Sequence, residues 1–502
     1  MDPRLRALAD LSVAEAREYA GRHEYDGVLQ DLSPDGVARG LAALGRAGSG
    51  PALADAHDEA HLVAFEAGAR VAFGELELHR RDPGVHLGAL DLACYDRAYA
   101  PEPDREQARR RHLAGWPDAV DAALASLDAV PRDVALGQLP AVRGLADGVE
   151  DTAALAAHAR LVAHVQQAAE HGNPDAALGA PALARLMGVP EALEVDLGAL
   201  AADADIERDR LTGLLADACE RLAPGQPVAQ TRVELERDHP DAGGVLVEAR
   251  AQTEEVMAWC AATGLVPYTD GQCLVGPAPG SRSNAMASLS WSAPGEAEGP
   301  SWFYVTPPDP SWPAQEQEQW LAVFSRATLP AVCLHEVAPG HFSHGRALRH
   351  VASPVRRLLL SPTFVEGWAH YGEQMAWEEG FRDGDPRLQA GVAIEALVRV
   401  TRLAAALGIH SASMTVTEAA QRFTDDAGLQ GPAALSEARR ATWDPTYGRY
   451  TWGKLAILRL REQARQRPGF TLAGFHRDLL ALGAPPLGLI PAALDPAPGG
   501  RG

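Results

Sequence analysis

The sequence has few cysteines and no long apolar run, and each absence excludes a class of protein. The five cysteines among 502 residues are scattered, without a CxxC pair, which argues against a disulfide framework. No stretch approaches the roughly 18 uninterrupted apolar residues of a membrane-spanning helix. The charged N-terminus lacks the apolar segment of a signal peptide. We therefore expect reduced thiols, a cytoplasmic location and no membrane-spanning helix.

The sequence also has fewer basic than acidic side chains. The chain has 45 Lys and Arg residues against 67 Asp and Glu residues, a formal net charge of −22. This balance argues against nucleic acid or an anionic membrane as the main partner. It leaves a small molecule or a short peptide open as substrate, because such a ligand responds to local charge.

Hydrophobic periodicity changes twice along the chain and suggests three parts. Up to residue 265, apolar residues recur at spacings of three and four, as in antiparallel helices with short loops. Segment 266–312 is rich in Pro, Gly and Ser around short β-prone runs, and WFYV (302–305) is its best strand candidate. Helical periodicity then returns. The predicted parts are a helical region 1–265, a catalytic region 266–490 with a small sheet, and a disordered tail 491–502.

The stretch CLHEVAPGHFSHG, residues 333–345, holds two histidines and a glutamate in an unusual spacing. His335 and His341 are six residues apart, whereas the zinc-binding HExxH motif places its histidines four apart on one helix face. Pro339 cannot continue the helix regularly, so a break at Pro339-Gly340 can return His341 towards His335. We predict both histidines as metal ligands and Glu336 as the base that deprotonates a water. The alternative is a helix end with polar residues facing solvent.

The next predicted helix carries a polar stripe on a largely apolar surface. Ser361 is its expected cap, and Glu366, His370 and Glu373 follow at steps of four and three. Buried carboxylates are costly unless they are paired or bind a metal. We predict Glu366 as the third ligand, with Glu373 as the alternative. Otherwise Glu373, with His370 beside it, orients a ligand histidine. The competing interpretation is a salt-bridged helix face.

Two later segments offer groups for substrate binding and for stabilising a transition state. Tyr447, Tyr450 and His410 are candidate donors to a developing oxyanion, the alternative being aromatic residues of the core or surface. Arg399 or Arg402 is a candidate for holding a substrate carboxylate, although an ordinary helical ion pair with Glu395 also explains Arg399. The WFYV strand, which includes Tyr304, is expected to pair with an extended substrate.

HEVAPGH together with EGWAHYGE resembles a large bacterial family catalogued as a domain of unknown function (eight-eight-five) and treated as zinc metallopeptidases. The segments DPTYGRYTWGKL and LLALGAPPLGLI also carry the resemblance. The order of motifs is similar to that of thimet-type oligopeptidases. There a His-Glu helix is followed by a helix that gives the third ligand, and then by a tyrosine-rich segment.

The resemblance implies a mainly α, multi-helix, gluzincin-like metallopeptidase fold with a small β-sheet next to the active-site cleft. Zn²⁺ is the implied cofactor, held by His335, His341 and Glu366. The expected function is hydrolysis of amide bonds in short peptides, with Glu336 as general base. Two alternatives stay open: a metal-dependent hydrolase or lyase acting on a non-peptide metabolite, and a helical binding protein without catalysis.

Overall fold

The computed structural model describes residues 1–279 and 285–495 of the chain. These residues are mainly helical, with one small sheet, as the sequence predicts. Several helices begin with proline directly after an Asp or Ser, because proline suits the first helical position and the preceding side chain caps the free amides. Ser361, for example, accepts a hydrogen bond from the Phe364 amide at 3.0 Å. None of the described helices combines the length and apolar character needed to cross a membrane.

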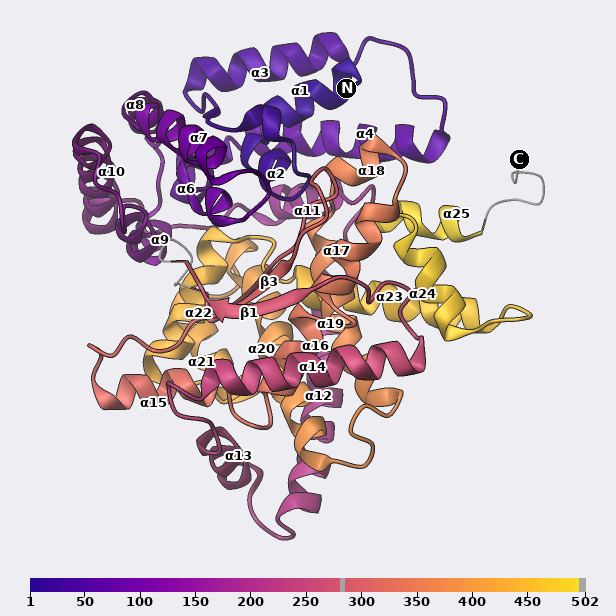
Figure 1. Cartoon of the computed structure of the whole chain (residues 1–502). Coiled ribbons are helices and arrows are strands. Elements are labelled where there is room, and N and C mark those ends of the chain that lie inside the picture. Colours follow the sequence, from indigo (N-terminus) through magenta and orange to yellow (C-terminus); the bar gives the residue numbers. More distant parts are fainter. Residues whose placement is uncertain (280–284, 496–502) are drawn as a thin grey trace.

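In Figure 1 most helices of the first part lie along the top and upper left, and its last helices lie below the sheet. They are α1 (Pro3–Asp10), α2 (Val13–Glu18), α3 (Pro34–Ala47), α4 (Ala56–Ala69), α5 (Leu78–Arg81), α6 (Pro83–Leu90), α7 (Glu102–Ala114), α8 (Trp116–Ser126), α9 (Arg132–Gly144), α10 (Thr152–His171), α11 (Ala180–Gly188), α12 (Leu197–Leu222), α13 (Val228–Arg237) and α14 (Val245–Thr263).

The helices of the second part follow the sheet in sequence and fill the centre of the molecule. They are α15 (Ala314–Ala322), α16 (Leu329–Glu336), α17 (His341–His350), α18 (Pro354–Leu358), α19 (Pro362–Glu378), α20 (Pro386–His410), α21 (Val416–Ala427), α22 (Gly431–Trp443), α23 (Arg449–Arg465), α24 (Leu472–Leu480) and α25 (Ile490–Leu494).

The sheet has three strands in the order β1-β3-β2, where β1 is Cys273–Pro277, β2 is Ala287–Ser290 and β3 is Ser301–Val305. β1 runs parallel to β3 and β2 runs antiparallel to it. The predicted WFYV strand is therefore confirmed as β3. It is the central strand, however, and its backbone groups pair on both sides. The expectation that it pairs with an extended substrate is wrong, because it has no free edge.

Two of the hydrophobic cores formed by the described residues divide the molecule differently from the predicted boundary at residue 265. One core joins residues of the first part from Leu90 to Ala176. The other is larger and joins α12 to the helices of the second part, with α12 lying along α20. The boundary at 265 stays a prediction based on composition. Of the predicted tail, α25 includes its first residues, and residues 496–502 lie outside the described part.

Two glycines allow α19 and α23 to touch backbone to backbone. A Cβ added to Gly367 would lie 2.5 Å from the Cα and carbonyl carbon of Gly453, closer than real Cβ contacts. The pair α19 and α23 is among the most extensively packed in the protein. Gly367 directly follows Glu366, and Gly453 lies three residues after Tyr450. The crossing therefore sets the spacing between two predicted site residues.

Gly367→Ala is expected to destabilise the protein by about 3 kcal/mol, the upper part of the usual range for overpacking a tight interior. The check is the urea midpoint followed by circular dichroism. Gly213→Ala is the matched control, because Gly213 also lies within a helix but a Cβ there meets no atom within 4 Å. That control should be neutral or slightly stabilising. An unchanged midpoint for Gly367→Ala would contradict the close helix crossing.

Candidate metal centre

The Pro-Gly insertion separates two helices and turns the second histidine back towards the first. α16 ends at Glu336 and α17 begins at His341. The Gly340 amide donates to the Leu334 carbonyl at 3.0 Å, and a Cβ on Gly340 would overlap the His335 carbonyl, so only glycine fits. The Trp368 indole holds the Pro339 carbonyl at 2.9 Å. As a result, the rings of His335 and His341 lie 4.8 Å apart.

Three side chains direct potential ligand atoms at one point. Glu366 Oε2 lies 3.4 Å from His335 Nε2 and 3.3 Å from His341 Nε2, and the three atoms lie within 4.8 Å of one another. Glu366 Oε2 is buried, yet it makes no contact of hydrogen-bond geometry with the described residues. Bonds of about 2.0–2.1 Å in a tetrahedral site separate neighbouring ligand atoms by about 3.3 Å. The two imidazoles and the carboxylate therefore fit a divalent metal ion.

Glu373 supports this cluster from about two turns further along α19. Its fully buried carboxylate accepts a hydrogen bond from His335 Nδ1 at 2.7 Å and another from Arg399 at 3.0 Å, while His370 Nδ1 lies 3.4 Å away. Burial alone would raise the pKa of this carboxyl, but Arg399 and the two histidines hold it well below its usual range. An ionised Glu373 holds the Nδ1 proton of His335, so that Nε2 is the ring nitrogen that faces the cluster and can bind a metal ion after losing its own proton.

The two histidines that contact Glu373 have pKa values that are shifted in opposite directions. Burial and the Arg399 charge lower the pKa of His335, but the nearby carboxylates of Glu366 and Glu373 prevail and raise that pKa to about 9. Burial and the nearby Lys454 ammonium lower the pKa of His370 to about 3. Near neutral pH the metal-free cluster therefore holds a protonated His335, and a metal ion must displace that proton to bind.

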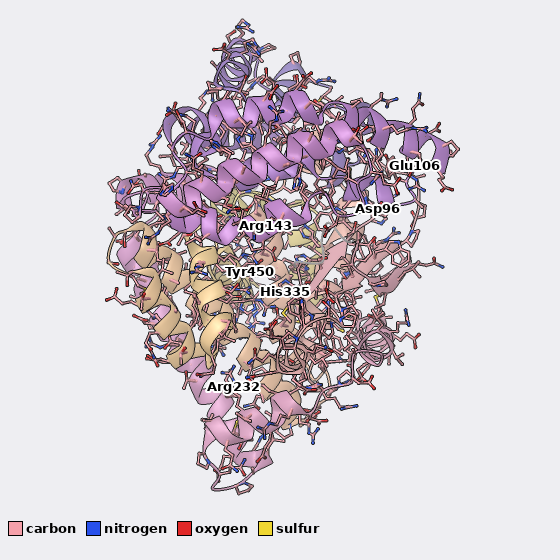
Figure 2. All side chains as sticks on the ribbon, turned by 90° about the vertical axis from the view of Figure 1, so that its left-hand side faces the viewer. Asp96, Glu106, Arg143, Arg232, His335 and Tyr450 are labelled. Atoms are coloured by element: carbon pink, nitrogen blue, oxygen red, sulfur yellow. The ribbon has the colours of Figure 1, made fainter. Side chains whose placement is uncertain are left out.

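Glu336 and Tyr450 are polar residues near the cluster whose side chains form no hydrogen bond with the residues that the structure describes. Glu336 is mostly buried and directly follows His335, and its carboxylate forms no hydrogen bond with the described residues. The Tyr450 ring lies 6.2 Å from the His335 ring, and Figure 2 shows both near the middle of the molecule. Burial and the Glu366 charge raise the pKa of Tyr450, so its hydroxyl keeps its proton.

Tyr447 and His410 do not have the positions expected for oxyanion donors. Tyr447 is fully buried and donates its hydroxyl to Glu437 at 2.8 Å. His410 is buried at the end of α20, where its Nε2 bonds to the Ala441 carbonyl at 2.8 Å. The described structure joins neither side chain to the cluster by a hydrogen bond. Both hold α22 in place instead.

The predicted substrate-binding residues are likewise engaged within the protein. Arg399 pairs with Glu373 and lies 3.5 Å from Glu395, so its charge supports the cluster from within. Arg402 donates two hydrogen bonds to Glu437, at 2.9 and 2.8 Å. Tyr304, on the central strand, stacks on Trp302 with ring centroids 5.9 Å apart. These three side chains contact other residues of the protein, and their assignment to the substrate stays a prediction.

Arg440, on α22, was missed by the sequence analysis. Its guanidinium lies 4.4 Å from the centre of the Tyr447 ring, and its side chain is 39% exposed. A signal was available, because Arg440 precedes Asp444 by four residues and Tyr447 by seven, both helical spacings.

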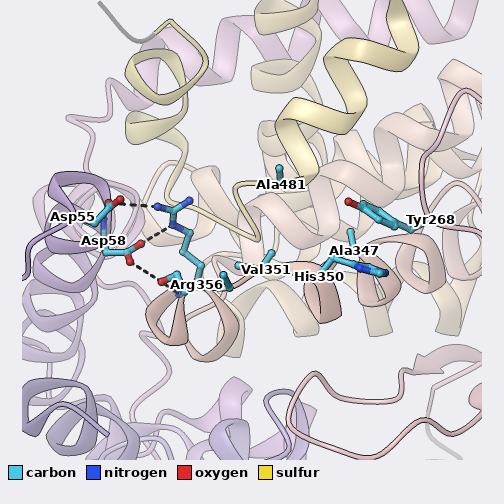
Figure 3. Close-up of a pocket in the computed structure, with 10 residues that line it drawn as sticks. Asp55, Asp58, Tyr268, Ala347, His350, Val351, Arg356 and Ala481 are labelled. Atoms are coloured by element: carbon cyan, nitrogen blue, oxygen red, sulfur yellow. Dashed lines mark hydrogen bonds and ion pairs between the residues drawn. The ribbon is translucent and has the colours of Figure 1, made fainter. Parts of the chain in front are cut away.

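A cavity of about 480 Å³ lies at the opposite end of α17 from His341 (Figure 3). Tyr268 stacks on His350 along one side, with ring centroids 4.6 Å apart. On the other side Arg356 pairs with Asp58 at 2.6 Å and lies 3.4 Å from Asp55. These ion pairs link α18 to α4. The predicted ligands are not among the described residues that line this cavity.

Comparison with known protein families places the chain. Residues 133–494 match the family described as bacterial protein of unknown function (DUF885). The chain belongs to this family. The match includes HEVAPGH, EGWAHYGE and every side chain of the metal-ligand cluster. The family resemblance predicted from these motifs is thus confirmed at the level of the DUF885 family.

Two solved structures share the fold of this DUF885 protein. One is a candidate lipoprotein of unknown function from Shewanella oneidensis, with 21% identity and a TM-score of 0.77, covering 98% of both chains. The other is a candidate lipoprotein from Colwellia psychrerythraea, with 17% identity and a TM-score of 0.77, covering 98% of this chain and 97% of the other. No curated protein matches the sequence. The cytoplasmic location stays a prediction.

Proposed function

We propose that this DUF885 protein is a zinc-dependent hydrolase that cleaves amide bonds in short peptides. The observation that carries the proposal is the convergence of His335, His341 and Glu366 on one point, with Glu336 directly after His335 and without a hydrogen bond to the described residues. Two histidines, one carboxylate and an adjacent glutamate form the usual set of a zinc hydrolase. We infer a gluzincin-like relationship from the same set and from the order of the motifs.

The protein residues have separable tasks in this reaction. Zinc, when bound, would lower the pKa of a water and polarise the carbonyl of the scissile bond. Glu336 accepts a proton from the attacking water and later transfers it to the leaving amine. Tyr450 donates its hydroxyl proton in a hydrogen bond to the developing oxyanion. Glu373 keeps His335 in the tautomer that leaves Nε2 free, and Arg399 keeps Glu373 ionised.

The test combines metal analysis with a peptide screen. Protein purified without chelators is expected to contain about one zinc per chain by elemental mass spectrometry. The same sample should cleave members of a mixture of di- to hexapeptides, followed by liquid chromatography and mass spectrometry, and a chelator should abolish cleavage. Zinc without cleavage of any peptide would shift the proposal to a non-peptide amide. Absence of zinc, even after incubation with zinc, would favour a helical binding protein.

A further inference from the structure

Four arginines surround the tyrosines next to the candidate centre, and three of them have a carboxylate partner. Arg399 pairs with Glu373 at 3.0 Å, and Arg402 pairs with Glu437 through two hydrogen bonds. Arg449 donates two hydrogen bonds to Asp444, at 2.7 and 2.8 Å. These pairs use the charge of each arginine inside the protein. Arg440 is the fourth of these arginines.

Arg440 has no comparable partner. Its guanidinium donates no hydrogen bond to the residues that the structure describes, and its Nε is buried without a partner. The nearest carboxylate, Asp444, lies 3.9 Å away and already binds Arg449 on both oxygens. Desolvating part of a guanidinium without hydrogen-bonding it is unfavourable, so a missing acceptor is indicated.

The surroundings of Arg440 hold its guanidinium in place. It stacks on the fully buried Tyr447 ring at 4.4 Å and lies 5.4 Å from the Trp443 ring centre. Stacking on a ring face leaves the edge of the guanidinium available for two parallel hydrogen bonds. Because 39% of the side chain is exposed, an anion can reach that edge from solvent.

A continuous series of ring contacts connects this guanidinium to the candidate centre. Tyr447 and Tyr450 have ring centroids 6.4 Å apart, and Tyr450 in turn lies 6.2 Å from the His335 ring. Tyr450 therefore lies between the metal-ligand cluster and the arginine. A ligand that extends from the cluster past Tyr450 can place a negatively charged end at Arg440.

We propose that Arg440 binds a carboxylate of the substrate, so that the preferred substrates are short peptides or other amides with a free carboxylate beyond the cleaved bond. This inference rests on the proposed function for the identity of the cleaved bond. The anion site itself depends only on Arg440 and its aromatic neighbours. Arg440 takes the carboxylate-binding role that was predicted for Arg399 or Arg402, whose guanidinium groups pair with carboxylates of the protein.

The test compares an acid with its amide, using thiol ligands that bind zinc. The probes are N-mercaptoacetyl-alanine peptides with one to three alanines, each as the free acid and as the C-terminal amide. Calorimetry with zinc-loaded protein measures both dissociation constants. The acid of the best-fitting length is expected to bind about 10- to 100-fold more tightly, the range for charge-assisted hydrogen bonds. In Arg440→Gln this preference should fall below about threefold.

Arg439→Gln is the matched control, because it removes the neighbouring positive charge on the same helix and should keep the full preference for the acid. Zinc content and circular dichroism are measured for each variant. Should the glutamine variant fail to fold, Arg440→Lys replaces it, with a preference at least threefold below wild type, since lysine lacks the forked geometry. Equal binding of acid and amide at every length, or an unchanged preference in the Arg440 variant, overturns the inference.

The zinc measurement separates this inference from the proposed function. Zinc bound without any acid preference overturns the anion site and leaves the metal centre. A protein without zinc that still prefers the acid, and loses this preference only in the Arg440 variant, supports the anion site and overturns the metal centre.

Discussion

Glu366→Ala is expected to leave the protein without zinc after purification. Among the described residues, the substitution removes the one carboxylate oxygen that faces both histidines, so two ligands remain. Removal of a group that merely orients a ligand costs about 10- to 100-fold in affinity, and loss of a direct ligand should cost more than that. Elemental mass spectrometry and competition with a fluorescent zinc chelator measure both the content and the loss of affinity.

The matched control for this variant is Glu379→Ala, which removes an exposed carboxylate just past the end of the same helix. It should retain about one zinc per chain. Circular dichroism confirms that Glu366→Ala is folded, and Glu366→Gln provides a variant of the same shape. If Glu366→Ala kept its zinc with unchanged affinity, the third ligand would have to be sought elsewhere, with Glu373 as the next candidate.

Glu336→Gln is expected to retain zinc and lose at least about 100-fold in kcat, within the 10²- to 10⁴-fold contribution of a positioned general base. Glutamine keeps the shape of the side chain but cannot accept the proton of the attacking water. Because Glu336 is not a member of the ligand cluster, the metal should stay bound. The rate is measured on the peptide that the wild-type protein cleaves fastest.

Two results would argue against this role for Glu336. Full activity with a full complement of zinc would exclude it as the general base. Loss of zinc together with activity would instead place its carboxylate among the ligands. Glu379→Gln, with the same change of side chain at an exposed position, should match the wild type in both measurements.

The local features of the site followed from the sequence. Ser361 begins α19 as predicted, and the break at Pro339-Gly340 returns His341 to His335. Both depend on neighbouring residues, through capping and through the geometry of proline. Thr328 precedes α16 and is of a residue type that often caps helices, but its hydroxyl donates to the Val323 carbonyl and contacts the Ser325 hydroxyl instead.

The features that sequence could not reveal depend on partners far along the chain. Arg402 and Tyr447 share Glu437, which lies 35 residues from the arginine. Arg399 is held mainly by Glu373 instead of by the helical neighbour Glu395. Periodicity indicates which face of a helix is buried, but it does not indicate which ionised groups meet there. The spacing of Arg440 from Asp444 and Tyr447 can be seen in the sequence, but the lack of a hydrogen-bond acceptor for its Nε among the described residues shows only in the structure.

The backbone contact between Gly367 and Gly453 also limits how the two helices of the candidate site, α19 and α23, can move. Two helices in such close contact cannot slide or separate without losing their packing, since packed interiors do not deform continuously. Glu366 and Tyr450 therefore belong to one rigid body. Arg440 lies on α22, which packs against α9, α20 and α21. Any motion that opens the site to a substrate would therefore move Glu366 and Tyr450 together. It would change the distance from these two residues to α22, which carries Arg440.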